Sequence, residues 1–318
     1  MPRIDTLVTH SGWFHADEVL SAAVLSRLFP AASLVRTRDP RAFEMENAIV
    51  FDVGSEYDPA RNRFDHHQRG APIRQDGTPF SSFGLIWKSY GMAYIAELGV
   101  EPEFAAVVFE RFEQDIVLPI DQIDNGIVSP AETGRYPQLS FDRLIANLNP
   151  TFDGRCERID GRRAEDARFE NAMILAGDLV EAYVAQAEAE LRAGALVRQE
   201  IQDCTGPVLV LRGAIPFDSA IAEAGAEHIL FVVYPRDDDW ALAGVRRDPN
   251  DYPLRQDLPA EWAGLEGLDL VEQSGVPDAI FCHQLRFFAV AGSREGALRM
   301  AELAMPQPEV DTGFAVCG

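Results

Sequence analysis

The sequence predicts an α/β protein with a parallel N-terminal sheet, a long helix and a second, smaller α/β domain. Short apolar runs alternate with segments of helical spacing along the chain. One unbroken stretch, residues 162–196, is rich in Ala, Glu, Leu and Arg and favours a single long helix. Because 318 residues exceed the usual size of one domain, we expect a division into residues 1–155, a helical linker over 156–198, and residues 199–318.

The first elements place polar side chains at the ends of two buried strands. Ile4–Thr9 is apolar enough for a buried strand, and residues 17–29 carry apolar side chains at helical spacing. A second apolar run, Ala48–Phe51, ends in Asp52. Because open α/β sheets bind ligands at the carboxyl ends of their strands, we expect Asp52 and the segment His10–Glu18 to share one edge.

The next stretch of chain is predicted to be a loop followed by helices. Residues 70–80 are polar and contain Gly and Pro, which favours a mobile loop. Residues 81–91 have a serine cap, an apolar stripe and a closing glycine, and we expect a helix there. A longer helix is expected from Glu103 towards an Asp-Asn-Gly segment at 124–126.

The remainder of the chain is typical of a second α/β domain. Short apolar runs with strand character alternate there with segments of helical spacing. The strands are predicted at 207–211, 229–234, 241–245, 279–282 and 287–290, and the helices near Asp218 and over 293–304.

The composition indicates which binding partners and which cell compartment are compatible with the chain. A net charge of −23 argues against a basic surface that grips long duplex DNA, although cations bound in an acidic cleft still permit phosphate chemistry. The four cysteines are far apart and form no Cys-x-x-Cys pair. No run approaches the ~20 apolar residues that span a bilayer, and no signal peptide is recognisable, so we expect a cytoplasmic protein without a membrane partner.

Two histidine clusters predict a metal site. Four of the six histidines lie in the pairs His10/His15 and His66/His67, each with a carboxylate beside it. Imidazole and carboxylate together suit Mn, Fe or Zn, and Asp52 between the clusters could bridge two ions. Two ions about 3.5–4 Å apart can orient a hydroxide towards phosphorus. The residues therefore predict phosphoester hydrolysis.

The motifs, taken in order, resemble the DHH phosphoesterase superfamily and, within it, the MYG-type branch. The resemblance extends over most of the chain and implies a DHH-type N-terminal domain that holds the metals. It also implies a C-terminal domain that binds substrate. The segments that carry it are Thr9–Gly12, Phe14–Glu18, Asp52–Gly54, Tyr57–Pro59, Phe64–Gln68, Gly84–Lys88, Ile123–Ile127 and Glu295–Leu298.

The resemblance implies two divalent ions, with Mn²⁺ foremost, and a role for each site residue. A histidine, His15, stands where the superfamily usually has an aspartate, and this extra nitrogen ligand leaves other transition metals open. The implied ligands are His10, His15 and Asp52 for one ion, and Asp17, Asp52, His66 and Asp124 for the other, with Asp121 as the alternative to Asp124. Asp65 would orient His66, and His67 would contact the phosphate or protonate the leaving oxygen.

Substrate contacts are expected from both domains. The C-terminal domain offers His283 at the end of a strand, together with Arg255 and Arg286. Lys88, the only lysine in the chain, is a further candidate for a phosphate contact. Residues 284–287 lack the glycines that relatives usually have after this histidine, so backbone phosphate binding is not expected there.

The leading hypothesis is a metal-dependent phosphodiesterase. By resemblance it is a 3′-to-5′ exoribonuclease or oligonucleotide hydrolase that acts on short single-stranded RNA or nucleotides. Two alternatives remain open. One is hydrolysis of a small phosphorylated metabolite, such as pyrophosphate or a nucleotide 3′-phosphate, and the other is a non-catalytic, metal-stabilised binding protein.

Overall fold

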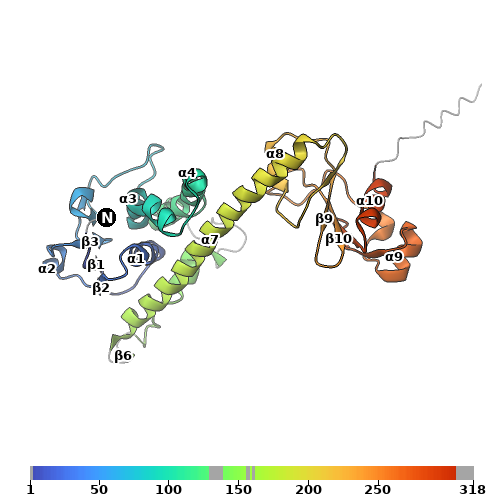
Figure 1. Ribbon diagram of the computed structural model, residues 1–318. Coiled ribbons are helices and arrows are strands. Elements are labelled where there is room, and N and C mark those ends of the chain that lie inside the picture. Colours follow the sequence, from blue (N-terminus) through green and yellow to red (C-terminus); the bar gives the residue numbers. More distant parts are fainter. Residues whose placement is uncertain (1–2, 129–138, 155–157, 160–161, 306–318) are drawn as a thin grey trace, which may run out of the picture. The chain divides into compact units, whose positions relative to one another are not determined.

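The computed structural model describes residues 3–128, 139–154, 158–159 and 162–305 (Figure 1). The chain divides into two compact units, Met1–Glu188 and Ala189–Gly318, called here the N-terminal and C-terminal units. The division falls inside the long helix α7, Ala164–Gln202. The border predicted at residue 155 lies outside the described residues. No helix in the described ranges combines the length and the apolar composition needed to cross a membrane.

The N-terminal unit is built on a five-stranded sheet in the order β2-β1-β3-β5-β4. All pairs are parallel except β4 with β5, so the predicted α/β class with a parallel N-terminal sheet is confirmed. The inner strands β1 and β3 are buried along their whole length, as parallel strands covered on both faces are. The strands are β1 Thr6–Thr9, β2 Ser33–Arg36, β3 Ala48–Phe51, β4 Tyr57–Asp58 and β5 Arg63–Phe64.

The helices of this unit include one that is longer than the sequence predicts. The prediction that the helix beginning near Ser81 closes at Gly91 is wrong, because α3 continues to Glu97. A Cβ atom at Gly91 would lie 2.7 Å from the Trp87 ring and 2.8 Å from the Phe109 ring, so the glycine allows α4 to pack closely on α3. The helical segments are α1 Ala16–Leu28, α2 Pro40–Phe43, α3 Ser82–Glu97, α4 Pro102–Phe112, a π-helical turn Glu113–Val117, α5 Leu118–Asp124 and α6 Phe141–Ala146.

The segment 70–80, expected to be a mobile loop, is tied to α5 and the π-helical turn. The Arg74 guanidinium donates to Asp121 Oδ2 from Nε at 2.8 Å and from Nη2 at 2.6 Å, and it also pairs with Glu113. The same guanidinium lies 4.5 Å from the centroid of the Phe80 ring. Arg74 therefore anchors the loop at its middle.

The C-terminal unit has its own five-stranded sheet, in the order β11-β12-β10-β9-β8, in which only β8 and β9 are parallel. Its strands fall within two residues of the predicted bounds, whereas the helix α9 was not predicted. The elements are β8 Val208–Val210, α8 Asp218–Glu223, β9 Phe231–Pro235, β10 Trp240–Gly244, α9 Gly267–Ser274, β11 Ala279–Cys282, β12 Phe288–Ala291 and α10 Arg294–Leu303.

Alternate side chains of β9 enter two separate cores. Phe231 and Val233 pack in the cluster that contains Met300 of α10, while Val232 packs in the cluster that contains Ile221 of α8. Because successive side chains of a strand point to opposite faces, one apolar run serves both cores.

Candidate metal centre

Three parallel strands deliver the predicted site residues to one edge of the N-terminal sheet. His10 directly follows β1, Asp52 follows β3, and the Asp65–His67 segment follows β5. These residues line a cavity of about 1170 Å³ together with Trp13 and other side chains. Its wall consists of His10, Ser11, Gly12, Trp13, His15, Arg38, Pro40, Phe43, Asp52, Val53, Gly54, Ser55, Asp65, His66, His67, Asp124 and Asn125.

Asp52 adopts a backbone conformation that is rare for a residue other than glycine. Its φ is +54°, and the turn continues through Gly54 at +101° and Ser55 at +55°. The Asp52 N–H still donates to the Phe64 carbonyl at 3.2 Å, which fixes the residue to the end of the sheet. Left-handed conformations of this kind cluster at functional sites, because the surrounding structure must hold them in place.

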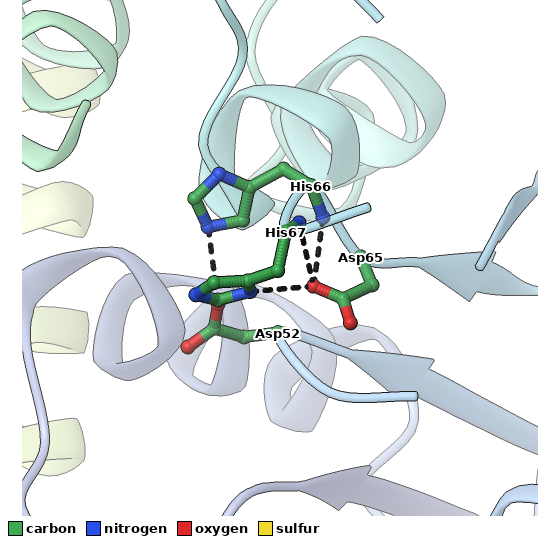
Figure 2. A group of neighbouring side chains, drawn as sticks. All are labelled: Asp52, Asp65, His66 and His67. Atoms are coloured by element: carbon green, nitrogen blue, oxygen red, sulfur yellow. Dashed lines mark hydrogen bonds and ion pairs between the residues drawn. The ribbon is translucent and has the colours of Figure 1, made fainter. Parts of the chain in front are cut away.

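The Asp52 carboxylate lies between two imidazoles. Its Oδ2 is 3.1 Å from His10 Nε2. Its Oδ1 is 3.2 Å from His66 Nε2, as Figure 2 shows for this second pair. All three side chains are almost completely buried. Each carboxylate oxygen of Asp52 therefore faces a different histidine.

Glu18 belongs to this cluster although the sequence reasoning did not include it. It is fully buried, its Oε1 is 3.0 Å from His10 Nε2, and its carboxylate accepts the His15 N–H at 2.9 and 3.0 Å. The resemblance assigned a metal-ligand role to Asp17 and no role to its neighbour Glu18. The signal available in the sequence is its place three residues after His15, where an acidic side chain turns back to cap the helix.

The other predicted ligands converge from helices. His15 at the start of α1, Asp17, and Asp124 at the end of α5 each present a ligand atom within 4.8 Å of the other two. Asp17 Oδ2 accepts a hydrogen bond from Ser82 Oγ at 2.9 Å, but Asp17 Oδ1 is buried without a partner among the described residues. His66 Nε2 is likewise buried without hydrogen-bond geometry to a described residue, although Asp52 and Asp124 oxygens lie within 3.4 Å.

Unpartnered buried polar atoms of this kind are uncommon, and they fit a cation. Asp17, Glu18 and Asp52 present oxygens within 4.8 Å of one another, and Asp52 groups in the same way with Asp65, His66 and His67. Carboxylate and imidazole form a donor set suited to divalent transition metals. The residues present therefore fit the predicted metal site.

The pKa values show how strongly burial and mutual repulsion act on the carboxylates of this cluster. Burial favours the neutral form of Asp52, but the close contacts with the His10 and His66 imidazoles outweigh it and lower the Asp52 pKa to about 2. Burial and the charge of Asp17 raise the pKa of Asp124 to about 9. For Glu18, burial outweighs the hydrogen bond from His10 and raises the pKa to about 8. Protons must therefore take the place of missing positive charge in this cluster.

The pKa values of the two buried histidines are raised as well. Burial alone would lower their pKa values, but the neighbouring carboxylates raise the pKa of His10 to about 10 and that of His66 to about 9. Asp52 makes the largest of these favourable contributions in both cases. Cations that enter the cluster must displace these protons, so metal binding is coupled to proton release.

Asp65 orients the ring of His67 and not, as the resemblance implied, the ring of His66. Asp65 Oδ1 accepts from His67 Nδ1 at 2.8 Å and from the His66 and His67 backbone N–H groups at 2.8 and 3.2 Å (Figure 2). Its Oδ2 accepts from the Ser55 N–H at 2.5 Å. Burial favours the neutral form of Asp65, but the His67 and backbone hydrogen bonds prevail and lower its pKa. The His67 side chain itself is 60% exposed in the cavity wall.

Two predicted residues of the N-terminal unit do not join the cluster. Asp121 is completely buried and accepts hydrogen bonds from Ser81, at 2.9 Å from N–H and 2.6 Å from Oγ, and from Arg74. It anchors the loop and the start of α3, so of the two alternatives only Asp124 reaches the site. Lys88 is exposed on α3 with Nζ 5.2 Å from the Phe80 ring centroid, and it is not part of the cavity wall.

The three predicted residues of the C-terminal unit have local partners. Arg255 Nη1 donates to the carbonyls of Ala226 and Ile229, at 2.6 and 3.0 Å. Arg286 Nη2 pairs with Asp257 Oδ2 at 2.7 Å, and His283 Nδ1 accepts the Leu285 N–H at 3.0 Å. Both arginines line a separate cavity of about 620 Å³ within this unit, and His283 is not part of its wall.

Comparisons with known proteins point in the same direction as the motifs. Residues 6–305 match MYG1_exonuc, described as an uncharacterised protein family (UPF0160). The chain is 34% identical over 339 residues to the MYG1 exonuclease of Homo sapiens, covering 96% of this chain and 86% of the human protein. It is 31% identical over 329 residues to a MYG1 protein of Schizosaccharomyces pombe, covering 97% and 100% of the two chains.

Among solved structures, the chain is similar to RecJ in complex with Mn²⁺ from Thermus thermophilus. The identity is 12%, the alignment covers 95% of this chain and 53% of that chain, and the TM-score is 0.27. This score is too low to carry an argument about a shared fold, so the description of the site rests on the chain's own geometry.

Proposed function

The chain belongs to the MYG1_exonuc family, and from this membership and the geometry of the site we propose a metal-dependent phosphodiesterase that shortens single-stranded RNA from its 3′ end. The prediction of an enzyme of the exonuclease and hydrolase class is confirmed, because proteins named MYG1 exonuclease are similar to almost the whole chain. The RNA substrate, the direction of degradation, the place in the DHH superfamily and the use of two ions are proposed in addition.

The position of Asp52 is the observation that supports this proposal most strongly. Its two oxygens face His10 and His66 separately, while Asp17 Oδ1 and His66 Nε2 remain without hydrogen-bond partners in the described chain. We assign one ion to the side of Asp52 that faces His10 and the other to the side that faces His66. The full proposed ligand set is His10, His15, Glu18 and Asp52 for the first ion, and Asp17, Asp52, His66 and Asp124 for the second.

When bound, divalent cations, with Mn²⁺ foremost, would stabilise charge on the phosphoryl oxygens and would lower the pKa of water, so that it loses a proton to solvent and is available as hydroxide at neutral pH. The chain provides the proton for the other side of the reaction. As the new bond from the water oxygen to phosphorus forms, the bond from phosphorus to the leaving oxygen breaks, and His67 Nε2 gives its proton to that oxygen. Asp65 supports the step, because its bond to Nδ1 raises the pKa of His67 and keeps the imidazolium available.

The charge of the molecule favours a short substrate. With 51 acidic residues against 28 basic ones, the chain lacks the surplus of positive charge that neutralises many phosphates at once. Short single-stranded RNA presents few phosphates to the acidic surface and has a free end that can enter the cavity.

Purified protein incubated with Mn²⁺ and 5′-labelled RNA oligomers tests the proposal. We expect a ladder of products shortened one nucleotide at a time from the 3′ end, with no activity in EDTA or in the Asp52→Asn variant. A wild-type protein that binds Mn²⁺ but leaves these oligomers intact would rule out the exonuclease. Release of inorganic phosphate from pyrophosphate or from a nucleotide 3′-phosphate, without any ladder, would instead identify the small-metabolite hydrolase.

A further inference from the structure

One arginine in the cavity wall has no part in the proposed chemistry. Arg38 follows β2 at the same sheet edge as His10, and the Thr37 N–H donates to the Thr9 carbonyl at 2.8 Å, which holds this segment beside the end of β1. The side chain is directed at the first histidine of the site. Its Nε donates to the Ser11 carbonyl at 3.3 Å, and its Nη2 lies 3.3 Å from His10 Nδ1.

The charge of Arg38 is not balanced by a carboxylate of the described chain. The nearest arginines in the sequence are each paired with a carboxylate. Arg36 pairs with Asp166 at 3.1 Å, and Arg41 pairs with Asp39 at 2.5 Å. Arg38 is exposed, and its polar contacts are to a carbonyl and an imidazole. Neither contact is to a negatively charged group, and at 3.3 Å both are readily exchanged for the shorter, charge-assisted bonds that a guanidinium forms with phosphate.

The remaining wall of the cavity is acidic. Asp52, Asp65 and Asp124 line it, and Arg38 is its only lysine or arginine among the described residues. An anionic substrate that enters this cavity needs positive charge away from the metal ligands, and the guanidinium supplies it.

The His10 ring separates Arg38 from the carboxylates. Nδ1 of this ring faces Arg38, while Nε2 faces Glu18 and Asp52 at 3.0 and 3.1 Å. A phosphate that contacts Arg38 would therefore lie on the other side of the His10 ring from a phosphate held near Asp52. This spacing indicates two phosphate positions in one cavity.

We propose that Arg38 binds a substrate phosphate next to the one that is hydrolysed, so that the site selects chains with two or more phosphates over simple phosphodiesters. The inference rests on the proposed function and adds a specificity residue to it. The planar guanidinium suits this task, since its fork of N–H groups matches two phosphate oxygens at once.

The test compares two substrates in Arg38→Met and Arg38→Lys. A labelled RNA pentamer has several phosphates, whereas bis(p-nitrophenyl) phosphate has only the one that is cleaved. We expect Arg38→Met to lower kcat/KM for the pentamer by about 10- to 100-fold, the range of a lost hydrogen bond to a charged group, and to leave the small diester unaffected. Arg38→Lys should have a kcat/KM for the pentamer between those of Arg38→Met and the wild type. The control is Arg41→Met, at an arginine that pairs with Asp39 and lies outside the cavity wall, and its kcat/KM should match the wild type.

Binding gives a second readout. Fluorescence anisotropy, with Ca²⁺ in place of Mn²⁺, measures how log Kd for the pentamer depends on the logarithm of the salt concentration. The slope of this plot should be smaller by about 0.7 in Arg38→Met than in the wild type, as expected for the loss of one phosphate contact to a single strand. Titration calorimetry with Mn²⁺ should show the same affinity in Arg38→Met as in the wild type.

Three results would overturn the inference. Equal losses on both substrates would place Arg38 at the scissile phosphate, weakened Mn²⁺ binding would make it a positioning residue for His10, and unchanged kinetics would exclude a contact. Failure of the proposed function looks different, because the wild type would then cleave neither substrate. In that case an unchanged Kd for the pentamer in Arg38→Met would still reject the phosphate contact.

Discussion

At the scale of single residues, the site depends on one strained aspartate. Asp52 has a φ of +54°, a conformation that costs on the order of 1–3 kcal/mol for such a residue. The turn places its two oxygens towards His10 and His66, one to each. A glycine would fit this backbone at lower cost but would provide no carboxylate. The strain is therefore explained by the carboxylate that it positions between the two histidines.

His67→Ala should separate proton transfer from metal binding. Without the imidazole, RNA cleavage should fall by about 10²- to 10⁴-fold, the usual contribution of a general acid. The rate of bis(p-nitrophenyl) phosphate cleavage should fall much less, because p-nitrophenolate leaves without needing a proton. Steady-state rates on both substrates and Mn²⁺ titration calorimetry provide the measurement. Equal losses on the two substrates, or a loss of Mn²⁺ affinity, would contradict the role given to His67.

The sequence predicted the histidines and Asp52 but could not choose among all the acids. His10 and Asp52 directly follow strands, and parallel strands end at a common edge, so their proximity follows from the pattern. His66 follows the two-residue strand β5, and its place at the site was expected from the histidine pairs and the resemblance. Asp121 and Asp124 lie three residues apart on one helix, and only the contacts with Ser81 and Arg74 reveal that Asp121 serves the loop. Glu18 was missed because the motifs of the resemblance give a ligand role to Asp17 and none to Glu18.

At the scale of elements, the packing of α3 against α4 depends on Gly91. Trp87, Phe109 and Phe112 form the contact, with the Trp87 and Phe109 rings stacked at a centroid distance of 5.4 Å. The glycine lies in the middle of α3 between these rings. Its cost in helix propensity is offset by the close approach of the two helices.

Gly91→Ala should therefore lower the free energy of unfolding. The new methyl group would lie 2.7–2.8 Å from two rings, and such overpacking costs about 1–3 kcal/mol. Gly177→Ala is the matched control, because this glycine also lies within a helix but has its nearest neighbour, Ala23 Cβ, at 3.9 Å. Urea denaturation should show Gly177→Ala to be neutral or more stable by about 0.5–1 kcal/mol. Equal effects of the two substitutions would contradict the packing argument.

The Arg74 anchor gives a second prediction for an element. Arg74→Met leaves Asp121 buried without its cation, which should reduce the free energy of unfolding by about 3–5 kcal/mol at pH 8. Burial raises the Asp121 pKa to about 6 even with Arg74 present, so the loss should be smaller at pH 5, where the carboxyl is protonated. Adding Asp121→Asn should recover part of the stability at pH 8. A loss independent of pH, or no recovery, would argue against the ion pair as the cause.

The sequence pattern predicts the buried strands better than the exposed or very short ones. β1 and β3 are buried on both sides and are therefore apolar throughout, so their position could be predicted. The edge strand β2 is partly exposed and includes Ser33 and Arg36, and β4 and β5 have only two residues each. Their strand character comes from pairing with neighbours and leaves no period of its own in the sequence.

At the scale of the whole molecule, the stability of the fold should depend on pH through the buried cluster of carboxylates and histidines. The pKa values of Glu18, Asp124, His66 and His10 are all raised, to about 8, 9, 9 and 10. A group whose pKa is raised on folding stabilises the fold below its unfolded pKa, and this contribution is lost as the pH rises through the folded value. Asp52, lowered to about 2, contributes constantly above pH 4 and does not oppose this trend.

The metal-free protein should consequently become less stable between pH 6 and pH 9. In EDTA, Tm should fall steadily over this range. The increase in Tm on adding Mn²⁺ should grow over the same range, because the ions displace fewer protons at high pH. Differential scanning fluorimetry with EDTA and with Mn²⁺ measures both. A metal-free Tm that rises with pH, or a Mn²⁺ effect that shrinks, would contradict the proton-filled cluster.

The account as a whole depends on whether two cations occupy the N-terminal site. Anomalous diffraction at the manganese edge, from crystals grown with Mn²⁺, tests this most directly. We predict two peaks in the cavity, one beside His10 and one beside His66, with the Asp52 carboxylate between them. A cavity without an anomalous peak, with manganese bound only elsewhere on the chain, would contradict the account.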